Sequence, residues 1–169
     1  MATISVGSTV WSSESKIGSL DGKSTSAYRI RQGIKLNSQD VAKNTSSVTF
    51  YVQMRSGGSY YFNGFTSPNA YQGYCVNGGS YTSDSSTQVK GIASSTGTDW
   101  VTVHSMTKTI THNSSGKATV RARAYFNPHI SSSNTTYYYV PAKSSYVYTD
   151  TYDLPDLHKV PVMSLISTT

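Results

Sequence analysis

The most constraining feature of the sequence is a strict alternation of side-chain character in its second half. From Ala118 to Phe126, small or apolar residues occupy every second position, and Thr, Arg and Tyr occupy the positions between them. Successive side chains of a β-strand point to opposite faces, so this pattern predicts a strand with one buried and one exposed face. Before it, Met106 and Ile110 share one parity and Thr107, Thr109 and Thr111 share the other. The segment 100–127 is therefore predicted to contain two strands.

The residues between these strands carry the chemistry of a tight turn. The sequence from 112 to 116 is HNSSG, in which Asn and Ser side chains bond nearby backbone and Gly adopts a positive φ without strain. The segment 100–127 is therefore interpreted as a β-hairpin. We expect His112 to bond carbonyl groups of the turn, and we assign a structural role to His112, Asn113 and Gly116.

Similar alternation recurs along the chain and predicts an all-β fold. One glutamate, few leucines and no apolar run of helix length argue for almost no helix. About seven or eight short strands with frequent turn signals are typical of an antiparallel β-sandwich, immunoglobulin-like or Greek-key, with an open-ended barrel as the alternative. Within 48–55, the residues expected to point inward are Val48, Phe50, Val52 and Met54. Further strands are predicted at 28–39, from Tyr60, and at 71–76, 88–93, 136–141 and 145–154.

Three regions are predicted. Residues 1–26 form an N-terminal arm with a short strand, 27–155 form the β-sandwich domain, and 156–169 form an extended C-terminal tail that begins where Pro155 and Pro161 end the alternation. The hydrophobic fraction is 36%, below the roughly 45–50% of ordinary globular proteins. The low apolar content and the two end segments lead us to expect a homo-oligomer.

Charge and N-terminal sequence limit the expected partners. The net charge is +6, but the 14 Lys and Arg residues are spread singly along the sequence. This spacing favours solvated strand faces over the basic cluster of a nucleic-acid-binding protein. No signal peptide and no stretch of about 20 apolar residues is evident, so neither secretion nor membrane insertion is expected.

The sequence offers no pattern for catalysis or metal binding. Cys75 is alone, which excludes an internal disulfide and suggests a small core residue. The four histidines have no zinc-site spacing, no Gly-x-Ser-x-Gly elbow is present, and no calcium-loop string occurs. We therefore expect a protein that is not an enzyme, with no cofactor and no metal.

Aromatic residues are the remaining functional signal, since the chain contains 14 Tyr. Exposed Tyr and Trp supply flat faces and polar edges for saccharides, and aromatic residues are also enriched in protein interfaces. Packing between neighbouring strands is the third explanation, and the sequence leaves all three open. The candidate ligand-binding residues are Tyr60, Tyr61, Tyr71, Tyr74, Tyr81 and Trp100, with the irregular region 60–98 as the expected place for a receptor site.

Three short segments resemble motifs of one protein family. Residues 110–120, ITHNSSGKATV, resemble a T-V-x-H-N-x-D-G-x-x-T-V motif of tail-associated structural proteins from siphophages that infect Gram-positive bacteria. Residues 44–49 resemble the N-x-S-x-V-T entry to the family's second strand, and Leu154-Pro155 resembles its Leu-Pro close. Ser115 stands where the family has Asp, and Lys159 stands near the place of an Arg.

The resemblance implies a virion module of immunoglobulin-like type. We expect such a protein at the tail tip or baseplate, made in the host cytoplasm, with other virion proteins as partners and with adhesion to host cell-wall polysaccharide as a task. A capsid decoration protein and a stand-alone carbohydrate-binding module are the alternatives. The resemblance implies no ligand-binding residues, because its motif is structural.

Overall fold

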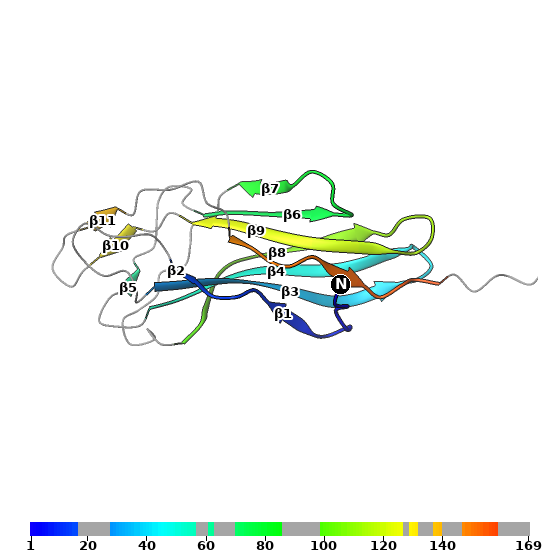
Figure 1. Ribbon diagram of the computed structural model, residues 1–169, viewed down its shortest axis with the longest axis horizontal. Coiled ribbons are helices and arrows are strands. Elements are labelled where there is room, and N and C mark those ends of the chain that lie inside the picture. The colour runs from blue at the N-terminus through cyan, green and yellow to red at the C-terminus, as the bar shows by residue number, and fades with distance from the viewer. Residues whose placement is uncertain are drawn as a thin grey trace, which may run out of the picture.

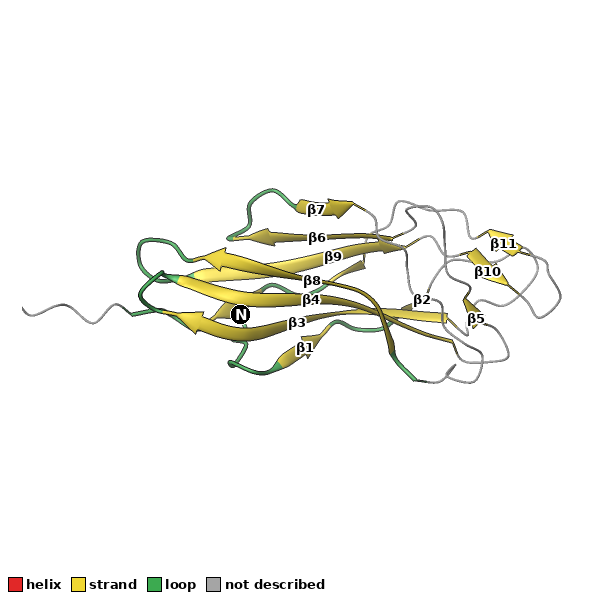
Figure 2. Cartoon of the chain, turned by 180° about the vertical axis from the view of Figure 1, so that it is seen from behind, coloured by secondary structure: helices red, strands yellow, loops and turns green. Residues whose placement is uncertain are grey.

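A computed structural model describes residues 1–16, 28–56, 61–62, 70–85, 99–126, 129–131, 137–139 and 147–158. These residues form strands and loops and include no helix, and their strands pair antiparallel, so the all-β prediction is confirmed (Figures 1 and 2). The strands are β1 (Thr9–Trp11), β2 (Ser15–Lys16), β3 (Tyr28–Asp40), β4 (Thr45–Ser56), β5 (Tyr61–Phe62), β6 (Ala70–Val76), β7 (Thr82–Ser85), β8 (Val101–Thr111), β9 (Ala118–Phe126), β10 (His129–Ser131), β11 (Tyr137–Tyr139), β12 (Val147–Tyr148) and β13 (Tyr152–Leu154).

Two of the sheets share one hydrophobic core. The first sheet has the order β1-β3-β4-β8, with β2 also beside β3, and the second has the order β12-β9-β6-β7, with β13 also beside β9. Two layers around a common core are the arrangement that the sequence predicted as a sandwich. The core residues are Ile4, Ile34, Leu36, Val48, Phe50, Met106, Ile110, Ala118, Val120, Ala122 and Leu154.

The alternation predicted for single strands is confirmed. All four inward residues of β4 are buried, and Val48, Phe50 and Met54 are 0% exposed. In β9, Val120 and Ala122 are equally buried while the arginines between the alanines are partly exposed. Strand periodicity therefore identified the core face correctly on both sheets.

The predicted hairpin at 100–127 is wrong, because its two strands do not pair with each other. Strand β8 pairs with β4 in the first sheet, whereas β9 pairs with β6, β12 and β13 in the second. Residues 112–117 thus form a corner that carries the chain from one layer to the other (Figure 1). Alternation and turn chemistry are the same for a hairpin and for such a corner, so the sequence pattern alone did not distinguish them.

The first sixteen residues of the predicted N-terminal arm belong to the sandwich. Ile4 is fully buried in the core, β1 pairs with β3 along Thr9–Trp11, and β2 continues along the same strand. Similarly, Leu157 in the predicted tail is only 4% exposed. The folded unit therefore extends beyond 27–155 at both ends, while 17–26 and 159–169 lie outside the described residues.

The strand predicted at 145–154 is interrupted. In β12, Tyr148 is paired with Arg123 of β9, whereas in β13 Leu154 is paired with Ala118, so the register shifts by one residue between the two strands. A one-residue shift moves later side chains to the opposite face. Tyr148 is accordingly 41% exposed and Leu154 is buried, although residues 148 and 154 have the same parity and would share one face of an uninterrupted strand.

A small third sheet of order β11-β10-β5 lies at the end of the sandwich opposite the 112–117 corner (Figures 1 and 2). Its register aligns Tyr61 with Ser131 and Ser131 with Tyr137. The strand predicted at 88–93 lies outside the described residues.

Buried amides tie the two large sheets together. The register aligns Gln32 and His104 in one row of the first sheet, with Val52 between them. Gln32 donates its side-chain N–H to the carbonyl of Val147 in the second sheet, and His104 Nδ1 lies 2.6 Å from Gln72 Oε1 of that sheet. Both glutamines are at most 1% exposed. These bonds fix how the layers face each other, since a buried polar group left without a partner is costly.

Candidate functional site

Of the predicted aromatic candidates, the three whose side chains the structure describes, Tyr74, Tyr81 and Trp100, do not form one site. Tyr74 packs against the core, with its ring 4.9 Å from that of Phe50. Trp100 and Tyr81 contact outward-facing arginines of different sheets. Tyr61 lies in β5 of the small end sheet and Tyr71 in β6, and Tyr60 is outside the described residues.

Trp100 instead belongs to a cluster on the outer face of the first sheet. The guanidinium carbon of Arg31 lies 4.1 Å from the ring centroid of Trp11 and 4.3 Å from that of Trp100, so one cation contacts two indoles. Arg55 lies 5.1 Å from the Trp100 ring, and Tyr51 lies 6.1 Å from Trp11. We call these five residues the tryptophan–arginine cluster.

Neighbouring residues hold this cluster in place. A Cβ atom on Gly33 would lie 2.5 Å from the Trp11 ring, so the absence of a side chain there lets the indole lie flat on β3. Arg31 donates from Nε and Nη2 to the side-chain oxygen of Gln53 at 2.9 and 2.8 Å, and Arg55 forms a 2.7 Å ion pair with Glu14. Burial is the main cause that lowers the pKa of Arg31. The tryptophan–arginine cluster is thus an ordered surface.

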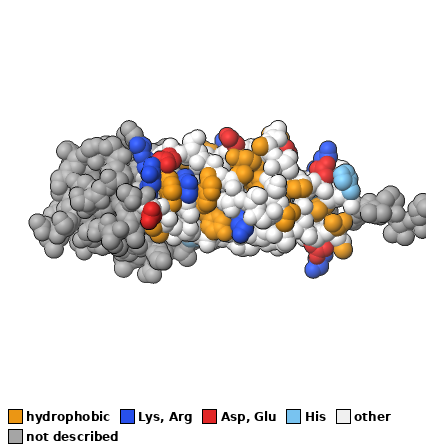
Figure 3. Space-filling model, turned by 90° about the horizontal axis from the view of Figure 1, so that it is seen from below, with side chains coloured by type: hydrophobic (Ala, Val, Ile, Leu, Met, Phe, Trp, Pro, Cys, Tyr) orange, Lys and Arg blue, Asp and Glu red, His pale blue; other side chains and the backbone are white. Residues whose placement is uncertain are grey.

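Hydrophobic and charged side chains interleave on this side of the molecule. In the view from below, hydrophobic groups alternate with Lys, Arg and acidic groups next to the part that is not described (Figure 3). Sequence reasoning missed Trp11, Arg31 and Arg55 as partners of Trp100, because they come from three distant segments. One pattern in the sequence did point to part of the cluster. Residues 29 and 31 share one face of their strand, and residues 53 and 55 share one face of the neighbouring strand.

A second arginine–aromatic cluster lies on the outer face of the other sheet. Arg123 lies 4.2 Å from the Tyr81 ring centroid and Arg121 lies 4.6 Å from that of Tyr148. The two tyrosine rings meet edge to face at 5.9 Å. Burial is the main cause that raises the pKa of Tyr81. This cluster covers β9 and its neighbours and is separated from the first by the core.

The three segments that carry the family resemblance meet at the opposite end of the sandwich. His112 is 4% exposed, its Nε2 lies 2.7 Å from the Ser46 hydroxyl, and its Nδ1 lies 2.8 Å from the carbonyl oxygen of Gly116. A carbonyl oxygen only accepts, so Nδ1 donates to it and Nε2 accepts from Ser46. The imidazole therefore connects the start of β4 with the turn after β8.

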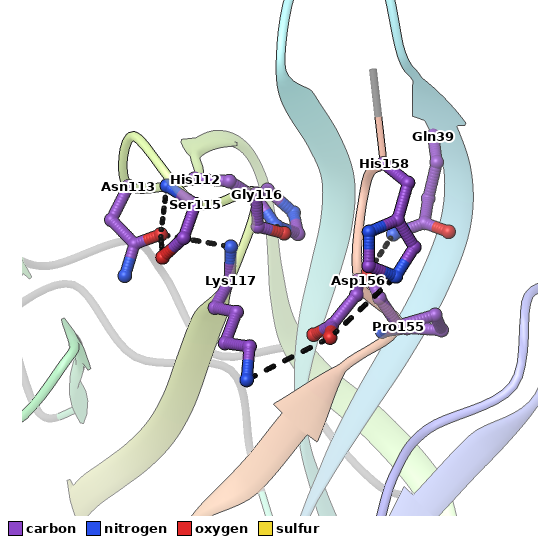
Figure 4. A network of polar contacts seen from close by, with 9 residues as sticks. All are labelled: Gln39, His112, Asn113, Ser115, Gly116, Lys117, Pro155, Asp156 and His158. Atoms are coloured by element: carbon purple, nitrogen blue, oxygen red, sulfur yellow. Dashed lines mark hydrogen bonds and ion pairs between the residues drawn. The ribbon is translucent and has the colours of Figure 1, made fainter. Parts of the chain in front are cut away.

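Two asparagines complete this corner. Asn113 Oδ1 accepts hydrogen bonds from the backbone N–H groups of Ser115 and Lys117 and from the Ser115 hydroxyl, at 2.9 to 3.0 Å (Figure 4). Asn44 has φ 56° and donates its side-chain N–H to the carbonyls of His112 and Asn113. The turn before β4 and the turn after β8 are thus bonded to each other.

The Leu-Pro segment closes the corner from its other side. Gly116 has φ 76°, and a Cβ atom there would lie 2.1 Å from the carbonyl oxygen of Leu157, whose own N–H donates to the Gly116 carbonyl. Gln39 donates to the carbonyl of Pro155 at 2.9 Å (Figure 4). Gly116 is therefore required both by its backbone conformation and by the close approach of the chain.

A polar depression of about 810 Å³ adjoins the corner. Lys117 Nζ and His158 Nε2 both lie 3.9 Å from the same oxygen of Asp156 at its edge (Figure 4). The three side chains are substantially exposed, so these ion pairs contribute little to stability.

Within the described residues, no group of three His, Cys, Asp or Glu side chains is arranged to hold a metal ion. The same residues contain no helix long and apolar enough to cross a membrane. Comparison of the chain with protein-family models, with curated proteins and with solved structures gives no match.

Proposed function

We propose that this chain is a structural module of a bacteriophage virion, located at the tail tip or baseplate, which acts without catalysis and contributes to adhesion to the host surface. The observation that carries the proposal is the corner. Residues 44–49, 110–120 and 154–155 each resemble a motif of one tail-protein family. Ser46 and Asn44 bond to His112, and Leu154 is paired with Ala118 in the register of β13 and β9. A resemblance whose distant parts form one physical unit is stronger than three short matches.

The adhesive part of the proposal is supported by the tryptophan–arginine cluster. It is ordered, partly exposed, and lies on a sheet face in the half of the sandwich away from the corner. Rigid aromatic and arginine side chains are the residue types enriched at binding surfaces. A stand-alone carbohydrate-binding module is the second candidate, and the same cluster favours it.

The test of the virion assignment is immunogold electron microscopy with antibodies raised against the purified chain, on particles of the phage whose genome encodes it. We expect gold at the tail end. Gold on the heads would replace the proposal with capsid decoration. Particles without label, together with binding of the purified chain to cell walls, would favour the carbohydrate-binding module.

A further inference from the structure

The outer face of the first sheet gathers basic residues that are widely separated in the sequence. The register of β2, β3 and β4 aligns Lys16 with Arg29 and Arg29 with Arg55, which gives one row of three basic residues across the strands. Arg31 and Lys35 follow on the same face of β3, because residues two apart in a strand share a face. The sequence showed these residues as single charges, and the register brings them together.

This face carries few acidic groups to balance them. Within the described part of the chain, Glu14 pairs with Arg55, and no ion pair involves Arg29. Like charges directly opposite each other on a sheet are destabilising. An anion that contacts Arg29 and its neighbours would relieve this repulsion.

We propose that this face binds an anionic polymer of the bacterial cell wall through phosphodiester groups, and not a neutral glycan. The inference rests on the proposed host-surface function and names the ligand class for it. Guanidinium groups bind phosphate oxygens with paired N–H donors, which makes Arg the preferred residue for such groups. Neighbouring strands lie about 5 Å apart, so Arg29 and Arg55, which are directly opposite each other, can contact one flexible charged chain.

The geometry of the tryptophans favours this ligand over a single-stranded nucleic acid. Nucleic-acid binding without sequence preference uses open aromatic faces on which bases stack. Here the Trp11 ring lies on Gly33 and contacts Arg31, and the Trp100 ring contacts Arg31 and Arg55. The indoles therefore position the guanidinium groups, and contact with the ligand falls to the arginines.

The experiment is biolayer interferometry of the full chain against three immobilised probes: poly(glycerol phosphate), an N-acetylglucosamine hexamer and a 20-nucleotide oligo(dT). We expect the chain to bind poly(glycerol phosphate) most tightly and to lose affinity with added salt, since exposed charge contacts are screened. R29Q should weaken binding about tenfold, the loss expected for one charge-assisted contact. E14Q should strengthen binding several-fold, since it removes the carboxylate that competes for Arg55.

The matched control is K43Q, which removes one positive charge from an exposed residue in the turn at the far end of β3. Equal losses in R29Q and K43Q would overturn the site, as would a chain that binds the neutral hexamer equally well or oligo(dT) more tightly. Binding to none of the probes, with gold still at the tail end, would overturn this inference and leave the virion proposal intact. If the phage particles carry no gold label but R29Q still weakens binding of the chain to poly(glycerol phosphate), the virion assignment is overturned and this inference stands.

Discussion

Removal of the His112 side chain should destabilise the protein more than removal of any exposed histidine. The imidazole is 4% exposed and forms two hydrogen bonds, to Ser46 at 2.7 Å and to the Gly116 carbonyl at 2.8 Å. H112A removes both bonds and leaves a space the size of the ring.

The expected loss in the free energy of unfolding depends on which hydrogen bonds Ser46 and the Gly116 carbonyl keep in H112A. The Gly116 carbonyl still accepts from Leu157 N–H, and the Ser46 oxygen still accepts from Gln39 at 3.1 Å, so neither oxygen loses every partner. Each lost bond then costs about 1 kcal/mol. Incomplete filling of the ring space adds about 1 kcal/mol or more. We expect the free energy of unfolding to fall by about 3 kcal/mol, which for a chain of this size lowers Tm by about 6–12 °C.

The assay is urea unfolding of H112A, S46A and the double variant, with H158A as the matched control. The His158 side chain is 81% exposed, so H158A should change the free energy of unfolding by less than about 0.5 kcal/mol. Because His112 and Ser46 share a bond, the double variant should lose about 1 kcal/mol less than the sum of the single losses. A loss in H112A no larger than in H158A, or additive losses in the cycle, would refute the role given to the imidazole.

The remaining predictions concern the same corner, the two faces and the assembly. G116A should lower the free energy of unfolding by at least about 3 kcal/mol, because its Cβ would meet the Leu157 carbonyl. Gly78 has φ 69° and open space around it, so G78A should lower the free energy of unfolding by only about 1 kcal/mol in the same urea assay. W11A should lower Tm more than W11F, because Phe keeps an aromatic ring over Gly33 and Arg31 whereas Ala does not; equal losses in Tm would contradict the aromatic contact with Arg31. A hydrogen bond from the Lys43 N–H is the main cause that lowers the pKa of Asp40. The stability that the Asp40 carboxylate contributes is therefore complete above the unfolded pKa of about 3.9 and is lost as the pH falls through the lower folded pKa. D40N should flatten the stability–pH curve only in that acidic range. Light scattering should detect an oligomer at micromolar concentration, and a stable monomer would contradict that prediction.

Sequence reasoning recovered the strands because burial imposes a period of two on them. Residues 48–54 and 118–124 were assigned to the correct faces from that period alone. The same period does not indicate which strands pair with each other. The alternation in β8 and β9 is satisfied equally by pairing with each other or by facing each other across a core, and the turn 112–116 fits both.

The alternation pattern also could not predict a one-residue shift in strand register. The shift between β12 and β13 reverses the faces of all later residues, and nothing in the composition of 149–151 marks it. The same limit applies to the tryptophan–arginine cluster. That Trp11, Arg31 and Trp100 are neighbours can be inferred only from the strand order β1-β3-β4-β8, which the sequence pattern does not supply.

The corner and the basic face differ in how strongly physics constrains their residues. At the corner, Gly116 meets a carbonyl oxygen where a Cβ would be, His112 contacts two partners in a buried space, and Asn44 adopts a positive φ while it donates two hydrogen bonds. Almost any substitution there breaks a contact whatever the protein binds. On the outer face of the first sheet, Arg29 is half-buried and forms no ion pair with the described residues, so the fold constrains its identity less, and the proposed ligand is what would select it. A family resemblance carried by the corner is therefore expected even among proteins that bind different partners, and ligand specificity has to be sought on the sheet face and at the end of the sandwich that carries β5, β10 and β11.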